Sequence, residues 1–291
     1  MRLALKIDVD TLRGTEEGVP RLVRLLKKHR AGATFLFSLG PDHTGRALRR
    51  MFRPGFFAKV NRTSVLEHYG LRTLLYGTLI PGPDIGRRGA DVMRSVRGEG
   101  FEVGVHCWDH VRWQDSVARR DAEWTRREMD LACERFEEIF KTEAKTWGAA
   151  GWQTNMHAAR YQERFDYASD TRGSRPFQPV WDGRAVGCPQ VPTTLPTLDE
   201  LIGRESDVVQ HLLGLTRAGS RDHVFTAHAE LEGGKLEPLF DALIGNWRSQ
   251  GYELVATRDI PRAPLPRHEV VYGEVPGRSG RLALQGKEVN A

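Results

Sequence analysis

Two histidines four positions apart could share one metal ion. They are His106 and His110, in the segment Val105-His106-Cys107-Trp108-Asp109-His110. On one face of a helix their Cβ atoms would lie about 5–6 Å apart, close enough for both rings to reach a divalent cation at about 2.0–2.1 Å. Two partly exposed histidines at a helix start would give the same pattern. A catalytic metal also needs a third ligand and an open position.

Two carboxylates follow the first apolar segment, residues 3–9. Asp8 and Asp10 lie on the same side of this segment if it is a strand, because side chains alternate with a period of two. Asp10 is nearer the tip and is the better candidate for the third ligand. Asp8, one step deeper, could act as a general base toward water.

A second group of polar side chains follows later apolar segments. His228 could protonate a leaving amine, and Asp170 could hold the tautomer of that imidazole. The structural alternatives are a hydrogen-bonded core histidine for His228 and a turn or capping residue for Asp170. Glu230 could equally be a charge at the rim.

The order of the expected elements would bring these residues together. Strand, helix and strand follow one another in the rhythm of parallel βα units. Strands are expected at residues 3–9, 33–37, 101–105, 145–148, 167–169, 185–191, 223–227 and 252–255, and helices at 15–32, 91–98, 117–140, 155–164, 207–215 and 236–250. This pattern predicts an α/β fold with a closed or nearly closed barrel, and the functional groups collect at the carboxyl ends of its strands.

We expect one domain over residues 1–260, an insertion at 41–86 and an extended tail at 261–291 with one possible strand at 269–272. In the insertion, Pro, Gly and Arg alternate with bulky apolar residues. This composition fits an interfacial element on an anionic bilayer. It fits an ordinary insertion that packs its aromatic residues on the domain equally well.

Composition narrows the class of protein. The chain has 291 residues, 40% of them hydrophobic and 28% charged, which is enough for a sizeable core and a charged surface. It has no apolar run long enough to span a bilayer, and the early Asp8 is not expected in a secretory signal. Three widely spaced cysteines suggest reduced thiols in a cytosolic setting. The net charge of +5 allows anionic partners, but no recognition motif supports binding of nucleic acid.

Five short motifs together resemble those of the polysaccharide deacetylases, over roughly residues 1–260. They are Asp8-Val9-Asp10, His106-x-x-x-His110, Gly148-Ala149-Ala150-Gly151-Trp152, Asp170-Thr171-Arg172-Gly173 and Thr226-Ala227-His228. The segment from Lys6 to Thr15, the segment around the two histidines, and His228-Ala229-Glu230 are most similar to one branch of that family. This branch deformylates undecaprenyl-phosphate-linked 4-deoxy-4-formamido-L-arabinose during lipid A modification, which is linked to resistance to polymyxin and other cationic antimicrobial peptides.

The resemblance implies a distorted seven-stranded β/α barrel, a role for each motif residue and one divalent ion, Zn²⁺ or else Co²⁺, Mn²⁺ or Fe²⁺. By motif, the base would be Asp8, the acid His228, its orienting residue Asp170, the metal ligands Asp10, His106 and His110, and the substrate-binding residues Trp152, Arg172 and Glu230. The sequence departs from the family in two places. Its first motif lacks adjacent aspartates, so Asp8 and Asp10 could exchange roles. Its third motif lacks the usual arginine, and Arg172 is a candidate to restrain the base instead.

The resemblance also implies a polyprenyl-linked substrate and hence a membrane surface. Each CH₂ group drawn from the bilayer into water costs about 0.8 kcal/mol, so the enzyme must come to the lipid. Phe52, Phe56 and Phe57 of the insertion could enter the bilayer beside basic residues, on the cytoplasmic leaflet of the inner membrane. The alternatives are a deacetylase or amidase of a soluble aminosugar or small ureide, and a catalytically silent carbohydrate-binding protein at the membrane surface.

Overall fold

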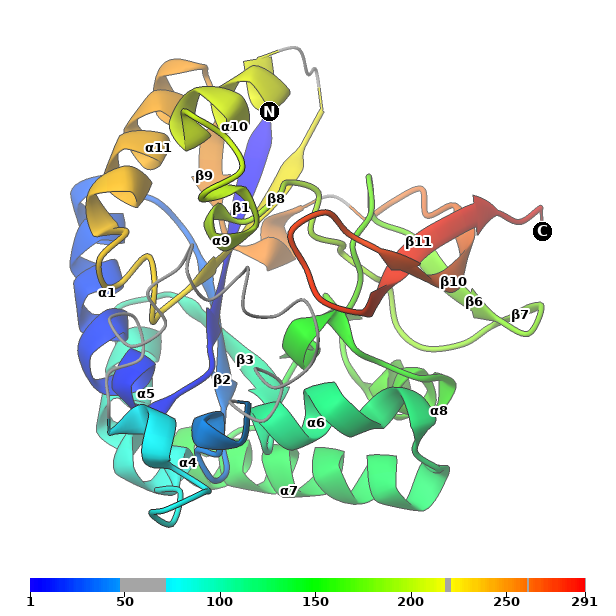
Figure 1. Ribbon diagram of the computed structural model, residues 1–291. Helices are drawn as coiled ribbons and strands as arrows, with labels where there is room; N and C mark the ends of the chain where they lie inside the picture. The colour runs from blue at the N-terminus through cyan, green and yellow to red at the C-terminus, as the bar shows by residue number, and fades with distance from the viewer. Residues whose placement is uncertain (48–71, 218–220, 261, 291) are drawn as a thin grey trace.

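The larger sheet of the protein is a curled, open half-barrel of parallel strands. The computed structural model describes residues 1–47, 72–217, 221–260 and 262–290, and within these ranges the sheet has seven strands (Figure 1). They are β1 (Arg2–Val9), β2 (Thr34–Ser38), β3 (Glu102–Cys107), β4 (Thr146–Trp147), β5 (Tyr167–Ala168), β8 (His223–His228) and β9 (Glu253–Val255). The order is β5-β4-β3-β2-β1-β8, and β9 pairs with the first residues of β1. The expected seven-stranded α/β architecture is confirmed.

Strand β1 lies in the middle of this sheet. It pairs with β2 on one side and β8 on the other, and it is buried from Leu3 to Val9. A parallel strand covered on both faces is normally apolar throughout. Lys6 and Asp8 break that rule, although both side chains are buried. Because buried charges cost free energy, these two residues indicate a functional role for this part of the sheet.

The half-barrel is bridged rather than closed between its edge strands β5 and β8. In the space between them, the backbone N–H of Val191 donates to the carbonyl of Ala168 at 2.8 Å, and that of Thr194 donates to the carbonyl of Val224 at 3.0 Å. Residues 189–195 therefore run between the two edges and satisfy part of their backbone. They include the end of the strand expected at 185–191.

Helices cover the outside of the sheet. Figure 1 shows α11 (Glu237–Ser249), α1 (Val19–Lys28), α5 (Ala90–Gly98) and α7 (Ala122–Phe140) following one another around it. The other α-helices in the described part of the chain are α4 (Ile85–Arg88), α6 (His110–Ser116), α8 (Met156–Tyr161), α9 (Leu198–Leu201) and α10 (Val208–Arg217). Short turns of π or 3₁₀ helix are η1 (Gly14–Gly18), η3 (Thr73–Leu75), η4 (Val117–Arg119), η5 (Ala150–Trp152), η6 (Gln162–Arg164) and η7 (Thr257–Asp259). Fully buried aromatic residues, such as Phe35, Trp147 and Phe225, fill the core between the two layers.

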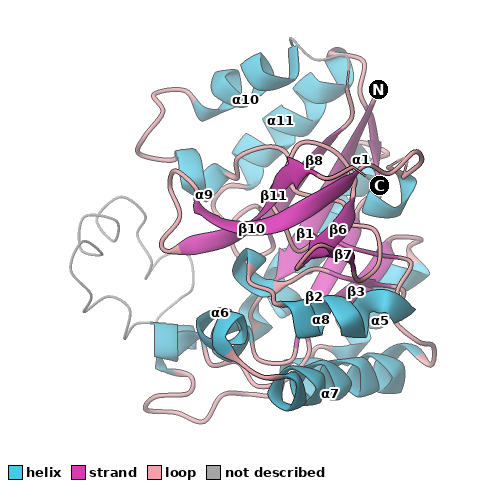
Figure 2. Cartoon of the chain, turned by 90° about the vertical axis from the view of Figure 1, so that its right-hand side faces the viewer, coloured by secondary structure: helices cyan, strands magenta, loops and turns pink. Residues whose placement is uncertain are grey.

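The segment after residue 260 corrects the expectation of an extended tail. It forms a hairpin of β10 (Arg267–Glu274) and β11 (Arg281–Glu288), and β10 pairs with β6 (Gln178–Trp181), which pairs with β7 (Arg184–Ala185). Figure 2 shows this hairpin on the side of the molecule that faces the viewer. Each strand contains a run of three apolar residues, 270–272 in β10 and 282–284 in β11, so two strands form where the sequence favoured one.

The insertion expected at 41–86 is described only at its two ends. Pro41 and Asp84 form an isolated antiparallel bridge there, which holds the ends together. Phe52, Phe56 and Phe57 lie outside the described residues. None of the described helices has the length and hydropathy needed to cross a membrane.

Candidate metal centre

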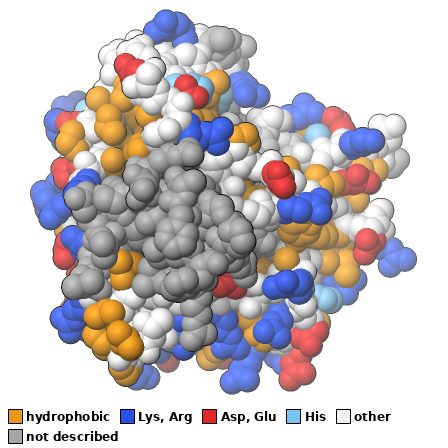
Figure 3. Space-filling model, in the orientation of Figure 1, with side chains coloured by type: hydrophobic (Ala, Val, Ile, Leu, Met, Phe, Trp, Pro, Cys, Tyr) orange, Lys and Arg blue, Asp and Glu red, His pale blue; other side chains and the backbone are white. Residues whose placement is uncertain are grey.

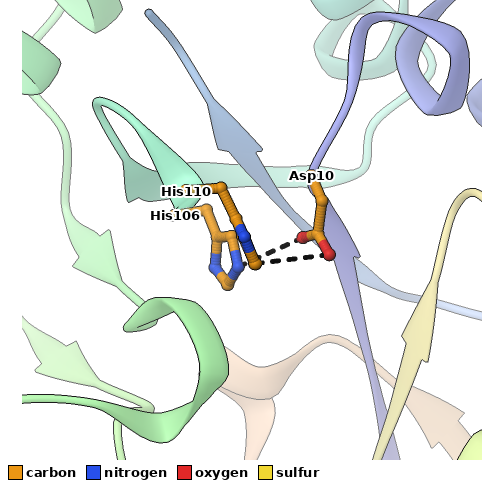
Figure 4. Close-up of side chains that lie close together, drawn as sticks. All are labelled: Asp10, His106 and His110. Carbon is orange, nitrogen blue, oxygen red and sulfur yellow. Dashed lines mark ion pairs between the residues drawn. The ribbon is translucent and has the colours of Figure 1, made fainter. Parts of the chain in front are cut away.

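Three potential ligands converge at the carboxyl ends of β1 and β3. One donor atom from each of Asp10, His106 and His110 lies within 4.8 Å of the others. His106 Nε2 is 3.3 Å from Asp10 Oδ1, and His110 Nε2 is 3.4 Å from Asp10 Oδ2. Figure 4 shows both imidazoles facing the carboxylate, across the space between the two strand ends. These are the three residues that the sequence predicts as ligands.

The two histidines do not lie on one helix, as the spacing alone suggested. His106 belongs to β3, and His110 is the first residue of α6. Their rings nevertheless lie side by side, with centroids 5.4 Å apart. The turn between the strand and the helix brings both side chains to Asp10. The two rings are therefore close enough to share a metal ion, as the spacing on a single helix also predicts.

A backbone contact orients His106, and a helix cap immediately precedes His110. His106 Nδ1 donates to the carbonyl of Gly148 at 2.6 Å, which leaves Nε2 facing Asp10. Asp109 caps α6 by accepting from the N–H of Arg112 at 3.0 Å, and it also contacts His43 Nδ1 at 2.5 Å. Contacts of this kind fix the tautomer and direction of histidines that bind metals.

The electrostatics of the cluster suit a cation. Burial alone would raise the pKa of Asp10, but His110 and His106 beside it hold that pKa well below its usual value. Burial opposes protonation of His106, yet Asp8 and Asp10 raise the pKa of this imidazole. Asp10 Oδ1 is buried and accepts no hydrogen bond from the described residues. A divalent ion would neutralise the excess negative charge and use this oxygen, so the residues fit a metal ion.

Lys6 restrains Asp8, the candidate base. Its Nζ lies 3.2 Å from Asp8 Oδ2, and both side chains are almost completely buried. The sequence assigned this task to Arg172, and the structure corrects that assignment. Arg172 is held elsewhere, with Nη1 donating to Glu200 at 2.5 Å and Nη2 donating to the carbonyl of Leu195 at 2.9 Å. The period of two in β1 could have identified Lys6, because Lys6, Asp8 and Asp10 alternate along one face.

A carboxylate that lies near the His228 ring is that of Asp199, whereas Asp170 contacts other residues. His228 Nδ1 lies 4.0 Å from Asp199 Oδ1. Asp170 instead accepts from the N–H of Ala149 at 2.8 Å and from the amide of Gln162 at 2.8 Å, so its carboxylate supports the loop after β4. Asp199 lies in the short helix α9, in a part of the chain where the sequence predicted no element.

Asp8 and His228 both lie beside the three candidate ligands. They occupy paired positions of the adjacent parallel strands β1 and β8, so their side chains lie on the same face of the sheet. Asp8 Oδ1 lies 3.9 Å from His106 Nδ1, and His228 lies near enough to Asp10 to contribute to the lowering of its pKa, after burial and the two candidate ligand histidines. The metal centre therefore has both a carboxylate and an imidazole beside it.

Each of the three residues predicted to bind substrate has structural contacts. The Glu230 carboxylate accepts from the N–H of Asp10 at 3.0 Å and from the N–H of Thr11 at 2.8 Å, so it supports the ligand-bearing loop. Trp152 is buried, and its ring faces His228 edge-on at 6.5 Å. The Arg172 guanidinium lies over that ring, 5.0 Å from its centroid.

Comparison with known proteins places this arrangement in a family. Residues 3–169 match the family model for polysaccharide deacetylase. A relative from Shewanella sediminis is 34% identical over 99% of this chain and 96% of its own. A relative from Wigglesworthia glossinidia brevipalpis is 31% identical over 94% of this chain and 99% of its own. Both are named "Probable 4-deoxy-4-formamido-L-arabinose-phosphoundecaprenol deformylase ArnD".

The fold agrees with solved structures. A protein from Mycobacterium smegmatis, provisionally named a polysaccharide deacetylase, superimposes with a TM-score of 0.60 at 14% identity, covering 94% of this chain and 95% of its own. At that identity the likeness concerns the fold alone. The family match covers more than half of the chain and contains β1, β3 and the three candidate ligands. The chain therefore belongs to the polysaccharide deacetylase family.

Proposed function

We propose that this protein is a metal-dependent deformylase that acts on undecaprenyl-phosphate-linked 4-deoxy-4-formamido-L-arabinose. The products would be formate and 4-amino-4-deoxy-L-arabinose-phosphoundecaprenol, used for lipid A modification and resistance to cationic antimicrobial peptides. The observation that carries the proposal is the convergence of Asp10, His106 and His110 beside a buried carboxylate and an imidazole. The names of the two relatives, at 34% and 31% identity over nearly the whole chain, support the substrate.

Asp10, His106 and His110 would hold the metal. A bound divalent ion polarises the formamide carbonyl and lowers the pKa of water. Two imidazoles and a carboxylate suit Zn²⁺, and Co²⁺, Mn²⁺ or Fe²⁺ also accept this donor set. The donor set does not discriminate among these ions. Metal analysis of the purified protein would identify the bound one.

The remaining side chains would move protons. Asp8 accepts a proton from the attacking water, and the ammonium of Lys6, 3.2 Å away, holds that carboxylate in position. His228 donates a proton to the nitrogen of the departing sugar amine. The two roles need two separate groups near the scissile C–N bond, and Asp8 and His228 come from neighbouring strands on the same face of the sheet.

The direct test is mass spectrometry of purified formamido-arabinose lipid before and after incubation with metal-loaded protein. We expect loss of one formyl group, and we expect chelator and His106→Ala to abolish it. An unchanged lipid with the metal-loaded protein would refute the proposed function. Equal turnover of a water-soluble formamido sugar would favour the soluble-substrate alternative.

The lipid substrate implies the place of action. We propose that the protein works at the periphery of the inner membrane, on its cytoplasmic leaflet, where the polyprenyl chain can stay in the bilayer. The net charge of +5 supports contact with anionic lipid.

A further inference from the structure

The turn of the β10–β11 hairpin places an arginine near His228, the proposed general acid beside the metal centre. Arg278 lies in this turn, 79 residues after Asp199 in the chain. Its Nη1 lies 3.0 Å from Asp199 Oδ2, and its Nη2 donates to Asp199 Oδ1 at 3.1 Å. Its Nε donates to Glu200 Oε1 at 2.7 Å. A two-point contact between guanidinium and carboxylate fixes the direction of both groups.

The hairpin turn packs closely against α9, and this packing holds Arg278 in position. Gly277 has a φ of +90°, and a Cβ atom there would lie 2.7 Å from the carbonyl oxygen of Glu200. Below the turn, the N–H of Arg172 donates to the carbonyl of Ala283 at 2.9 Å, and the N–H of Gln285 donates back to Arg172 at 2.8 Å. The turn therefore lies against α9, with no room for a side chain at its closest point.

Two contacts link Arg278 to His228. Asp199 Oδ1 lies 4.0 Å from His228 Nδ1, a ring nitrogen that is buried and has no hydrogen-bond partner among the described residues. The Arg278 guanidinium also lies over the ring of Trp152, 4.7 Å from its centroid, and Trp152 in turn faces His228 edge-on. Hydrogen bonds of catalytic groups are often long in the free enzyme and shorten with substrate bound.

The charge of Asp199 depends on these neighbours. Burial alone would raise its pKa, but Arg278 and His228 hold the pKa below its usual value. Asp199 therefore stays an anion that can orient the imidazole and stabilise its protonated form.

We propose that Arg278 is a positioning residue of this active site, which holds Asp199 and Trp152 against His228 and so makes the C-terminal hairpin part of the catalytic apparatus. This inference rests on the proposed function, in which His228 donates a proton to the leaving amine. The contacts of Arg278 with Asp199, Glu200 and Trp152 all lie on the His228 side of the centre. Its removal should therefore slow the proton donation and leave the metal in place.

The test compares Arg278→Gln and Arg278→Lys with the metal-loaded wild type. For Arg278→Gln we expect kcat to fall by about 10–100-fold, the usual cost of losing a residue that orients a site histidine, with KM and metal content nearly unchanged. Arg278→Lys should recover part of kcat, because lysine keeps the charge but not the two-point contact. Arg175→Gln is the matched control, because it removes another arginine that contacts the hairpin, at Glu288, in an exposed pair. It should behave as the wild type does.

The possible results distinguish the role of Arg278 from the proposed function of the protein. A wild-type kcat in Arg278→Gln, a loss confined to KM, or an equal loss in Arg175→Gln would overturn the role of Arg278. If Arg278→Gln does not fold, Arg278→Lys carries the test: reduced kcat at full metal content supports the proposal, and wild-type kcat overturns it. Failure of the wild type to release formate from the lipid would instead overturn the proposed function itself.

Discussion

Lys6 and Asp8 form an ion pair on the central strand, and both side chains are almost completely buried. Burying two charges is costly, and the pair is tolerable only while both partners are present. Most buried ion pairs add little net stability compared with apolar residues. We therefore interpret Lys6 as a residue kept for what it does to Asp8, namely to hold the candidate base in position beside the candidate metal ligands.

Lys6→Met should remove this restraint with little change in side-chain size. We expect an unfolding free energy lower by about 3–5 kcal/mol, because an unpaired carboxylate remains buried, and a kcat lower by about 10²–10⁴-fold, the usual contribution of a general base. Chemical denaturation and formate release measure the two effects. Lys27→Met, which breaks an exposed pair with Glu99, should change neither much. Wild-type activity of Lys6→Met would show that Asp8 needs no cationic partner.

Glu232 is a second buried carboxyl group, and it should make stability depend on pH. Burial raises its pKa to about 7 from a usual 4.5, although its contact with the N–H of His228 opposes the rise. Because the folded pKa lies above the unfolded one, this group favours folding fully below pH 4.5, and that contribution is lost as pH rises to about 7. The loss amounts to about 3 kcal/mol for a shift of this size.

In Glu232→Gln this pH-dependent loss should disappear. Between pH 5 and pH 8 its unfolding free energy should therefore fall by about 3 kcal/mol less than that of the wild type. Denaturant titrations at the two pH values measure this, and Glu253→Gln, at a mostly exposed site, is the control. Identical pH profiles for Glu232→Gln and the wild type would mean that Glu232 is not protonated in the fold.

At the scale of elements, the metal centre depends on how α6 begins. His110 is its first residue, and Asp109 is its N-cap. A lost aspartate cap costs about 1 kcal/mol, but here the same side chain also contacts His43 at 2.5 Å. We therefore expect the start of this helix to affect both local stability and the direction of His110, the residue next to the cap.

Asp109→Ala should separate these two effects when compared with Asp121→Ala, which removes the N-cap of α7. Both variants should lose about 1 kcal/mol of stability. Asp109→Ala alone should also bind the metal about 10–100-fold more weakly, as expected when a residue that supports a ligand is lost. Competition with a chromophoric chelator measures that affinity. Equal metal affinity in the two variants would show that the cap does not orient His110.

At the scale of the whole molecule, the proposed lipid substrate requires a surface that contacts the membrane. On the face shown in Figure 3, Lys and Arg side chains are spread among acidic ones. In the described part of the insertion, Leu79 is 82% exposed, and its neighbour Ile80 is exposed as well. Apolar side chains beside basic residues are typical of segments that lie on anionic bilayers. The insertion therefore remains our candidate for membrane association.

Replacing Phe52, Phe56 and Phe57 together by Ser should abolish co-sedimentation with anionic liposomes if the insertion holds the enzyme on the membrane. Activity on a water-soluble formamido substrate should persist, because these residues are far in sequence from the proposed catalytic groups. Leu215→Ser, at an exposed apolar position on α10, is the control and should bind liposomes normally. Unchanged liposome binding by the triple variant would exclude the insertion as the membrane contact.

The sequence alone determined the fold class and the three candidate ligands. Parallel strands bring their carboxyl ends to one edge of the sheet, so the order of the strands already predicts that Asp10 and His106 meet. The repeat of side-chain direction along strands and helices depends only on local geometry, and it was enough to predict that these two residues meet. The same period of two is sufficient to put Lys6 and Asp8 on one face of β1.

Only the tertiary structure decided which groups face one another across the loops. Asp170 follows a strand as expected, yet its carboxylate binds a neighbouring loop, whereas Asp199 and Arg278 reach the surroundings of His228 from a four-residue helix and a hairpin turn. No periodicity in the sequence indicates which distant loop will fold over a strand end. Such contacts depend on packing between segments far apart in the chain, and each exists only once the whole chain has folded.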